Sequence, residues 1–281
     1  AGIINGTGNF ILTEMRDKGR AFADVLKEAQ ELGYAEADPT FDVEGIDAAH
    51  KLTILSSVAF GIPLQFEQCY TEGISKVSAE DVANAESLGY RIKHLGLTRR
   101  TEAGIELRVH PTLIPEKRLI ANVHGVMNAV LVEGNAVGPT MYYGAGAGAD
   151  PTASSIVADL VDVVRDMAVD QNVRMPSLAF QQDAMSDSPI LSMDNVVTAF
   201  YMRMAVSDKP GVLAQITQIL GNAGISIEAI RQQTHVSSQV PVIILTRPVL
   251  EGHMNDAIKA IEALADVNGE VTRIRVENLD G

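Results

Sequence analysis

The chain has 281 residues, 46% of them hydrophobic, which is enough for two ordinary hydrophobic cores. Its 36 acidic residues outnumber its 22 Lys and Arg residues, and the resulting charge of -14 argues against a nucleic-acid partner. A single cysteine, Cys69, excludes an internal disulfide and a cysteine-based metal cluster. The apolar runs are too short and too interrupted to cross a bilayer, so we expect a soluble, intracellular protein without a membrane partner.

The first elements predicted are a buried strand at residues 2–4 and a turn at 5–7 that leads directly into the helix pattern NFILTEM. A domain rarely begins in the middle of a strand-turn-helix unit, so we expect a further segment before Ala1. Two helices are predicted here, ending near Gly19 and Gly33, because glycine is favoured just after a helix C-terminus.

A third helix is predicted from Asp42, as N-cap, to about Phe60. We expect most of it to be buried because it is rich in apolar residues, namely Ile46, Leu52, Ile54, Leu55 and Val58.

The middle of the chain alternates like a set of antiparallel strands. VSAEDVANAESLG predicts a helix, and alternating patterns then predict two antiparallel strands at 90–100 and 104–114, joined by a tight turn. Two further apolar runs, at 125–134 and 136–144, are strand-like. A strong helix pattern follows, with Asp150 as N-cap and Pro151 at the first helical position. Residues 171–198 are typical of a linker.

Residues 199–281 form a separate pattern. Strand, helix, strand, strand, helix and strand follow one another, which is the βαββαβ order with both helices on one face of an antiparallel sheet. The predicted fold class is therefore α/β (α+β): a mixed-sheet region over residues 1–170, then a ferredoxin-like module over 199–281.

Asp47 and Lys51 are the first candidate site residues. They are four positions apart, so on a helix they share one face. A surface ion pair worth a few tenths of a kcal/mol is the simpler interpretation. However, the helix is mostly apolar, and Glu36, Asp38 and Asp42 crowd the loop that precedes it. In a partly buried site, a lysine held by an aspartate can donate a proton, and the other carboxylates would suit a substrate with an ammonium group.

Three stretches carry a resemblance to a known family. AEADPTFDVEGIDAAHK (35–51), GIINGTGNFILTEM (2–15) and GPTMYYGAGAGADPTASSIVADL (138–160) closely resemble homoserine dehydrogenases. The resemblance covers residues 1 to about 170. It implies an enzyme that interconverts L-aspartate 4-semialdehyde and L-homoserine with NAD or NADP, in threonine and methionine biosynthesis.

The resemblance also implies roles for individual residues. Lys51 would transfer the proton, Asp47 would orient Lys51 or the substrate, and Glu36 would hold the substrate ammonium. The remaining residues implied to line the substrate pocket are Gly6, Thr7, Tyr34 and Asp42.

This sequence differs from the family in its nucleotide-binding domain. The strand–GxGxxG–helix fingerprint does not occur in this sequence. Gly144, Gly146 and Gly148 lie where the family's turn runs beside the cofactor, but a close-packed turn capped by Asp150 is an equally good interpretation, and an anionic cap disfavours phosphate. We therefore expect a chain without its nucleotide domain, inactive alone, whose helix 151–169 returns toward that domain. An amino-acid-binding or oligomerisation fragment without catalysis is the alternative.

Other polar residues carry weaker signals. His50 is expected to pack or to be solvated, and His110 and His124 are expected in strands without the spacing of metal ligands. Cys69 is expected to fill the core, as are the methionines.

The C-terminal unit carries a second resemblance. VSDKPGVLAQITQILGNAGISIEAIRQ (206–232) resembles an ACT domain, an amino-acid-sensing module, over Tyr201 to Glu277. It implies an allosteric site, with threonine as the first-choice effector. Backbone N–H groups of this site would bind the ligand carboxylate. An open sheet edge would pair with another copy in a homodimer or homotetramer, and oligomerisation alone is the alternative role. The residues expected in this site are Asp208, Gly211, Val212, Ile225 and Ser226.

Overall fold

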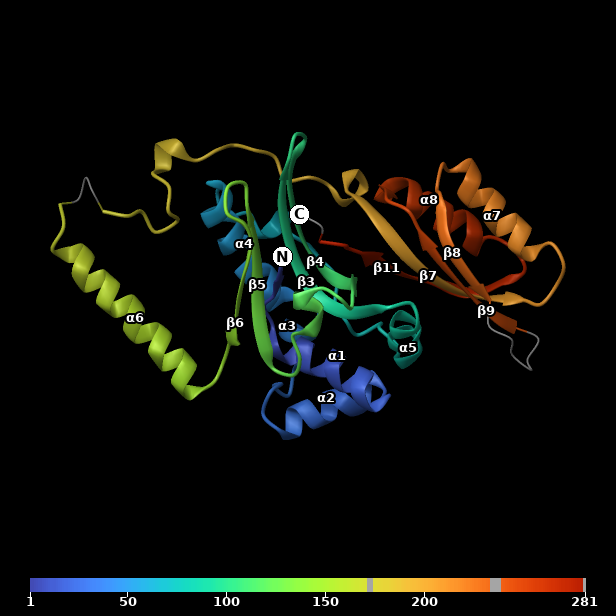
Figure 1. Ribbon diagram of the computed structural model, residues 1–281, viewed down its shortest axis with the longest axis horizontal. Coiled ribbons are helices and arrows are strands. Elements are labelled where there is room, and N and C mark those ends of the chain that lie inside the picture. Colours follow the sequence, from blue (N-terminus) through green and yellow to red (C-terminus); the bar gives the residue numbers. More distant parts are fainter. Residues whose placement is uncertain (171–173, 233–238, 280–281) are drawn as a thin grey trace.

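The computed structural model describes residues 1–170, 174–232 and 239–279 (Figure 1). Within them, one mixed sheet of 11 strands runs through the whole molecule in the order β6-β5-β1-β3-β4-β11-β7-β9-β8, with β2 and β10 beside this path. The predicted α/β class is confirmed.

The N-terminal region follows the predicted order of elements, except that one predicted helix is divided into two and one short strand is additional. Its helices are α1 (Gly6–Lys18), α2 (Phe22–Glu31), α3 (Thr40–Val43), α4 (Ile46–Phe60), α5 (Ala79–Ser87) and α6 (Ala149–Met167). Its strands are β1 (Gly2–Ile3), β2 (Tyr70–Thr71), β3 (Tyr90–Thr101), β4 (Gly104–Pro115), β5 (Met127–Gly134) and β6 (Gly138–Ala145).

The C-terminal module has the predicted βαββαβ order, with one extra short strand. Its elements are β7 (Val197–Ser207), α7 (Val212–Asn222), β8 (Ile227–Gln232), β9 (Gln239–Thr246), β10 (Val249–Leu250), α8 (Glu251–Glu262) and β11 (Val267–Val276). Both helices pack on one face of the sheet and share a core with Phe200, Met202 and Val242.

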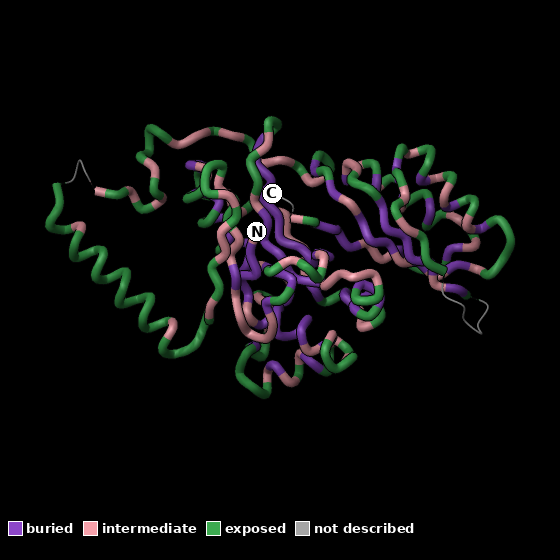
Figure 2. Tube along the Cα trace, viewed as in Figure 1, coloured by how far each residue is buried: buried purple, intermediate pink, exposed green. Residues whose placement is uncertain are grey.

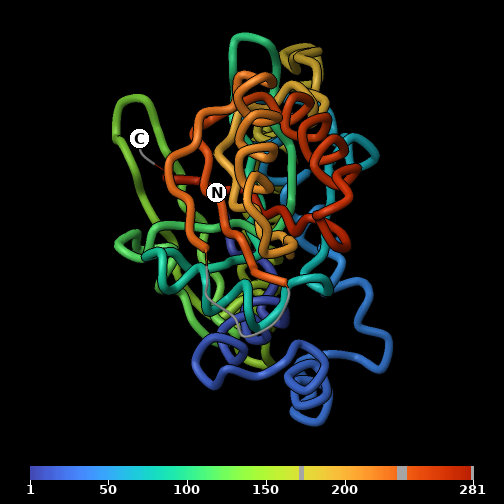
Figure 3. Tube along the Cα trace, turned by 90° about the vertical axis from the view of Figure 1, so that its right-hand side faces the viewer, coloured from blue at the N-terminus to red at the C-terminus, as the bar shows by residue number. Residues whose placement is uncertain are grey.

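The module is fused to the N-terminal region. β11 pairs in parallel with β4, so one edge expected to be open is occupied, and β8 is the outer strand among the described residues. The helix-free face of the module is covered as well, since Tyr201, Ile243 and Ile274 share a core with Val82 and Ala85 of α5. Figure 3 faces the module and shows the blue N-terminal helices below it.

Two predicted N-caps are wrong. Residues 40–60 form two helices, because Gly45 has φ 82° and ends the continuity between α3 and α4. The N-cap of α4 is Gly45 and not Asp42, and the N-cap of α6 is Gly148 and not Asp150, which lies in the first turn. Gly45 also lies close to the His94 ring: a Cβ at Gly45 would lie 2.9 Å from His94 Cε1.

The predicted burial of α4 is also wrong in this chain. α4 packs on the sheet through Ala48, Ala49 and Leu52, while Ile54 and Val58 are exposed. Every residue of α6 is at least partly exposed, and the helix stands away from the sheet (Figures 1 and 2). Apolar periodicity therefore predicted the helices correctly but not which of their faces this chain covers.

Candidate active site

The side chain of Asn5 organises the acidic cluster. Asn5 caps α1 by accepting a hydrogen bond from the Gly8 N–H at 2.7 Å. Its Nδ2 donates to Asp42 Oδ1 at 2.8 Å and to Asp47 Oδ2 at 2.9 Å. One amide thus holds together two carboxylates that would otherwise repel each other.

Lys51 lies against this pair. Its Nζ donates to Asp47 Oδ2 at 2.7 Å and to the Ile4 carbonyl at 3.2 Å, which confirms the predicted contact with Asp47. The Asp47 side chain is 21% exposed and that of Lys51 is 48% exposed. Because an ammonium group has three N–H donors, these two bonds fix the Lys51 head and leave one donor for a substrate oxygen.

Thr7 connects the cluster to the loop after α2. Its hydroxyl donates to the Tyr34 carbonyl at 2.5 Å, and the Tyr34 ring packs edge-on against Phe10 at 5.1 Å between centroids. Gly6 begins α1 where a Cβ would lie 2.8 Å from the Val126 carbonyl, so a side chain does not fit. Glu36 lies two residues beyond Tyr34 and is exposed.

Asn5 itself was missed in the sequence. A polar residue between a buried strand and the first turn of a helix is the available signal, and it predicts an N-cap. It does not predict the bonds to Asp42 and Asp47, which come from residues 37 and 42 positions away.

His94 packs beneath the cluster. Its ring lies against the positions of Gly8 and Gly45. Nε2 is 2.9 Å from the Glu72 carbonyl, so Nε2 carries the proton, and burial lowers the pKa of His94. The neutral ring therefore packs against the N-terminal ends of α1 and α4 and supports both.

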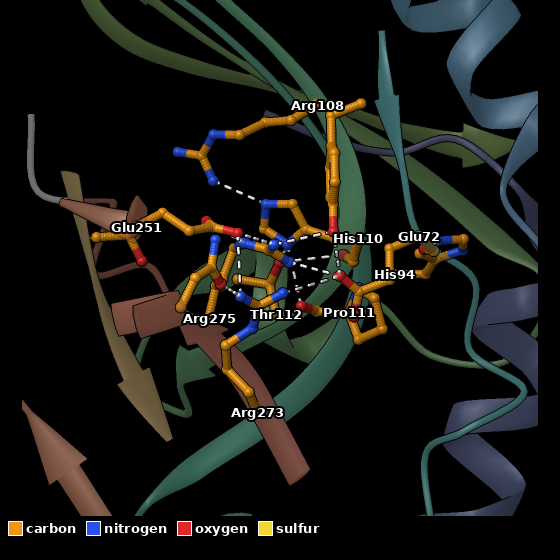
Figure 4. Close-up of polar contacts among 12 residues, drawn as sticks. Glu72, His94, Arg108, His110, Pro111, Thr112, Glu251, Arg273 and Arg275 are labelled. Carbon is orange, nitrogen blue, oxygen red and sulfur yellow. Dashed lines mark hydrogen bonds and ion pairs between the residues drawn. The ribbon is translucent and has the colours of Figure 1, made fainter. Parts of the chain in front are cut away.

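Buried charges connect this region to the C-terminal module (Figure 4). Arg275 of β11 donates to Glu251 at the start of α8 and to Glu72, the latter at 2.8 Å. Arg108 of β4 donates to Glu106 at 2.7 Å and to Glu277 at 2.5 Å.

His110 lies beside Arg108 in the same network. It accepts from Arg108 at Nε2, at 2.8 Å, so it is neutral, and burial together with Arg275 and Arg108 lowers its pKa well below the usual value.

A hollow lies on the C-terminal module. It has a volume of about 310 Å³. Of the residues expected in an allosteric site, Asp208, Gly211 and Val212 line this hollow. Ile225 is buried in the module core, and Ser226 is exposed outside the lining. The residues that line it are Val206, Ser207, Asp208, Lys209, Pro210, Gly211, Val212, Leu213, Gln232 and Val242.

The glycines proposed to lie beside a cofactor are on the turn from β6 to α6. A Cβ at Gly144 would meet no heavy atom within 4 Å, and one at Gly148 only Pro151, so the backbone is approachable there. At Gly146 the space is filled by the Asn128 side chain. Asp150 adds a carboxylate to the first turn of α6.

The remaining histidines and the cysteine lie apart from this chemistry. His50 stacks on Phe66 at 3.8 Å between ring centroids, as expected for a packing role. The prediction that His124 lies in a strand is wrong, because His124 precedes β5. Burial raises the pKa of Cys69 to about 11.

The described residues also offer no metal cluster and no membrane-spanning helix. No described group of three or more His, Cys, Asp and Glu residues could hold a metal ion. None of the helices in the described ranges is long and apolar enough to cross a membrane.

Comparison with known proteins places these features in a family. A homoserine dehydrogenase profile matches residues 1–161 and an ACT domain profile matches 201–266. The homoserine dehydrogenases of Pseudomonas aeruginosa and Neisseria gonorrhoeae are 66% and 57% identical over 100% and 99% of this chain. The chain spans 65% and 64% of their lengths.

A solved structure gives the same result. The crystal structure of a homoserine dehydrogenase from Thiobacillus denitrificans matches 99% of this chain and 64% of its own, with TM-score 0.95 and 66% identity. The cluster around Asn5, Asp42, Asp47 and Lys51 lies inside the profile match. The chain therefore belongs to the homoserine dehydrogenase family.

Proposed function

We propose that this chain provides the substrate-binding and proton-transfer part of a homoserine dehydrogenase, which interconverts L-aspartate 4-semialdehyde and L-homoserine with NAD or NADP. The observation that carries the proposal is the half-exposed Lys51, held by Asp47 and the Ile4 carbonyl inside the family-matched region.

Lys51 is the proton donor in this proposal. When bound, the nicotinamide supplies the hydride to the aldehyde carbon. The third N–H of Lys51 donates to the aldehyde oxygen and passes its proton as negative charge develops there. Asp47 keeps the ammonium head in place, and Asn5 keeps Asp47 in place.

Carboxylates select the substrate. An amino-acid substrate carries an ammonium group, which Glu36 binds from the loop after α2, assisted by the negative field of Asp42. The bond from Thr7 to the Tyr34 carbonyl fixes the position of this loop relative to α1. The open backbone at Gly144 and Gly148 is the part of this chain that fits a cofactor, whereas Asn128 excludes Gly146 from that role.

The C-terminal hollow is proposed as an amino-acid effector site. The Gly211 turn opens α7, whose first N–H groups suit a carboxylate, and Asp208 suits an ammonium. Threonine, derived from homoserine, is our first-choice effector. Pairing through the outer strand β8 with a second copy would give a homodimer or homotetramer.

Steady-state kinetics of the full-length protein test the catalytic role. Lys51→Met should lower kcat by roughly 10²- to 10⁴-fold with the fold intact, because it removes the general acid but keeps the aliphatic stem. Lys27→Met on α2, whose side chain is 78% exposed, is the matched control and should behave as wild type. A Lys51→Met variant that keeps most of its kcat would exclude the proposed role.

Glu36→Gln separates binding from chemistry in the same assay. It should raise KM for the amino-acid substrate roughly 10-fold or more and change kcat less, since a charge-assisted bond to the ammonium is lost. An unchanged KM with a large loss of kcat would reverse the roles given to Glu36 and Lys51.

A further inference from the structure

Residues 70–74, from β2 to Ile74, connect the C-terminal module to the carboxylate cluster. We call them the bridging segment. The side chains of Tyr70 and Glu72 contact Arg275 of the module, while the main chain of Gly73 and Ile74 packs against the corner between α3 and α4. The two sets of contacts are made by neighbouring atoms of the same few residues.

On the module side, Glu72 pairs with Arg275. Glu72 Oε2 accepts from Arg275 Nη1 at 2.8 Å and from the Tyr70 hydroxyl at 2.7 Å. The guanidinium carbon of Arg275 lies 4.8 Å from the centre of the Tyr70 ring. Although burial opposes it, the Arg275 charge lowers the pKa of Glu72, so the pair is ionic.

On the site side, the bridging segment fixes the α3–α4 corner. The Ile74 N–H donates to the Val43 carbonyl at 2.8 Å. A Cβ at Gly73 would lie 2.7 Å from Glu44 Cα, so the backbone segments at Gly73 and Glu44 are in close contact. The Glu72 carbonyl accepts from His94, the ring that lies beneath Gly45.

The same corner carries the two carboxylates of the proposed site. Asp42 lies in α3 and Asp47 in the first turn of α4, on either side of Gly45. A displacement of the bridging segment would therefore change their spacing directly.

We propose that Glu72 is a positioning residue: its pair with Arg275 lets the C-terminal module set the spacing of Asp42 and Asp47, and so the affinity for the substrate. This inference rests on the proposed function of the Asp42, Asp47 and Lys51 site.

The effector hollow lies at the other end of the strand that carries Arg275. Just before β11, Asp266 pairs with Lys209 of the hollow at 2.6 Å and accepts from the Ser207 N–H at 2.8 Å. β11 then runs ten residues, about 30 Å, to Arg275 and Val276. A ligand that moves Lys209 would act on one end of a strand whose other end holds Glu72.

Glu72→Gln is the informative variant. It removes the charge and keeps the shape, while Arg275 keeps its pair with Glu251. Replacing Arg275 would instead leave two carboxylates without their buried partner and destabilise the fold. Glu80→Gln is the matched control, because Glu80 of α5 pairs with another module arginine, Arg203, at 3.1 Å.

The experiment measures the His94 side chain and the kinetics of full-length protein. In ¹⁵N-histidine NMR spectra, Glu72→Gln should shift or broaden the His94 Nε2–H signal, and Glu80→Gln should leave it unchanged. Glu72→Gln should raise KM for the amino-acid substrate roughly five- to fifty-fold, the usual range of coupling between sites, with kcat changed less than KM.

The outcomes are separable. A Glu72→Gln protein with wild-type His94 signals and KM would overturn the proposal, as would an equal effect of Glu80→Gln. A wild-type protein without dehydrogenase activity would overturn the proposed function, while a His94 response in Glu72→Gln would still support the connection to the α3–α4 corner.

Discussion

Lys93 is a buried lysine without a carboxylate partner among the described residues. It is 1% exposed, and its Nζ donates to Asn9 Oδ1 at 3.1 Å and to the Val123 carbonyl at 2.5 Å. Burial, assisted by Arg16 and Arg91, lowers its pKa to about 7 from 10.5. An unfolded lysine therefore binds more protons than the folded one between these values, and the contribution of Lys93 to the free energy of unfolding rises with pH across this window.

Lys93→Met should remove this dependence. In urea unfolding at a series of pH values between about 7 and 9.5, the wild type should gain up to about 1.4 kcal/mol per pH unit more than the variant. Lys27→Met, at an exposed site, should retain the wild-type slope. Equal slopes for wild type and Lys93→Met would mean that Lys93 stays charged when folded.

At the scale of elements, Gly45 decides the geometry of the acidic corner. Its positive φ allows α3 and α4 to meet at an angle, and its missing side chain leaves space for the His94 ring. The break places Asp42 in α3 and Asp47 in α4, where both accept hydrogen bonds from Asn5 Nδ2.

Gly45→Ala should therefore lower the free energy of unfolding by more than an alanine substitution at a left-handed glycine usually does. Gly33→Ala is the matched control, since Gly33 has φ 76° but nothing within 4 Å of a Cβ. We expect about 1–2 kcal/mol for Gly33→Ala from backbone strain, and at least about 1 kcal/mol more for Gly45→Ala from overpacking against His94. Equal destabilisation of both variants, measured by urea unfolding, would show that the contact with His94 is not tight.

Local patterns predicted most of these elements, and long-range contacts explain where they failed. Alternation in 90–114 predicted the hairpin of β3 and β4 correctly, since period two is a property of the strand itself. The apolar runs in 125–144 predicted the strands β5 and β6 but not their pairing. The close approach of the His94 ring to Gly45 could not be predicted, because the two residues are 49 positions apart. The Arg275–Glu72 pair joins residues 203 positions apart, and no local signal exists for it.

The contact between Asp47 and Lys51 was predictable for the opposite reason. Four-residue spacing on a helix brings the two side chains together whatever the rest of the fold does. The roles given to Glu36 and to the glycine turn stay predictions, because they came from the family resemblance.

At the scale of the whole molecule, the two regions share one sheet and one core. β4 and β11 are neighbouring strands, α5 covers the module's helix-free face, and Arg203 binds Asp81 with distances of 2.6 and 3.0 Å. Separating the regions would expose a sheet edge, an apolar face and several buried charges. The C-terminal module is therefore expected to unfold together with the N-terminal region.

Thermal unfolding of the 281-residue chain should accordingly show one main transition, and an effector should move all of it. Threonine at about one hundred times its Kd would stabilise the folded state by ~2.7 kcal/mol, which corresponds to a shift of roughly 5 °C. Isoleucine, methionine and lysine serve as comparisons. Gly211→Val should remove the shift, because a Cβ there would meet nothing within 4 Å and would stand in the space left to the ligand. Two separate transitions, of which threonine moves only one, would contradict the shared unfolding of the two regions. A melt that none of the four amino acids shifts would leave the module with an assembly role in place of a sensing one.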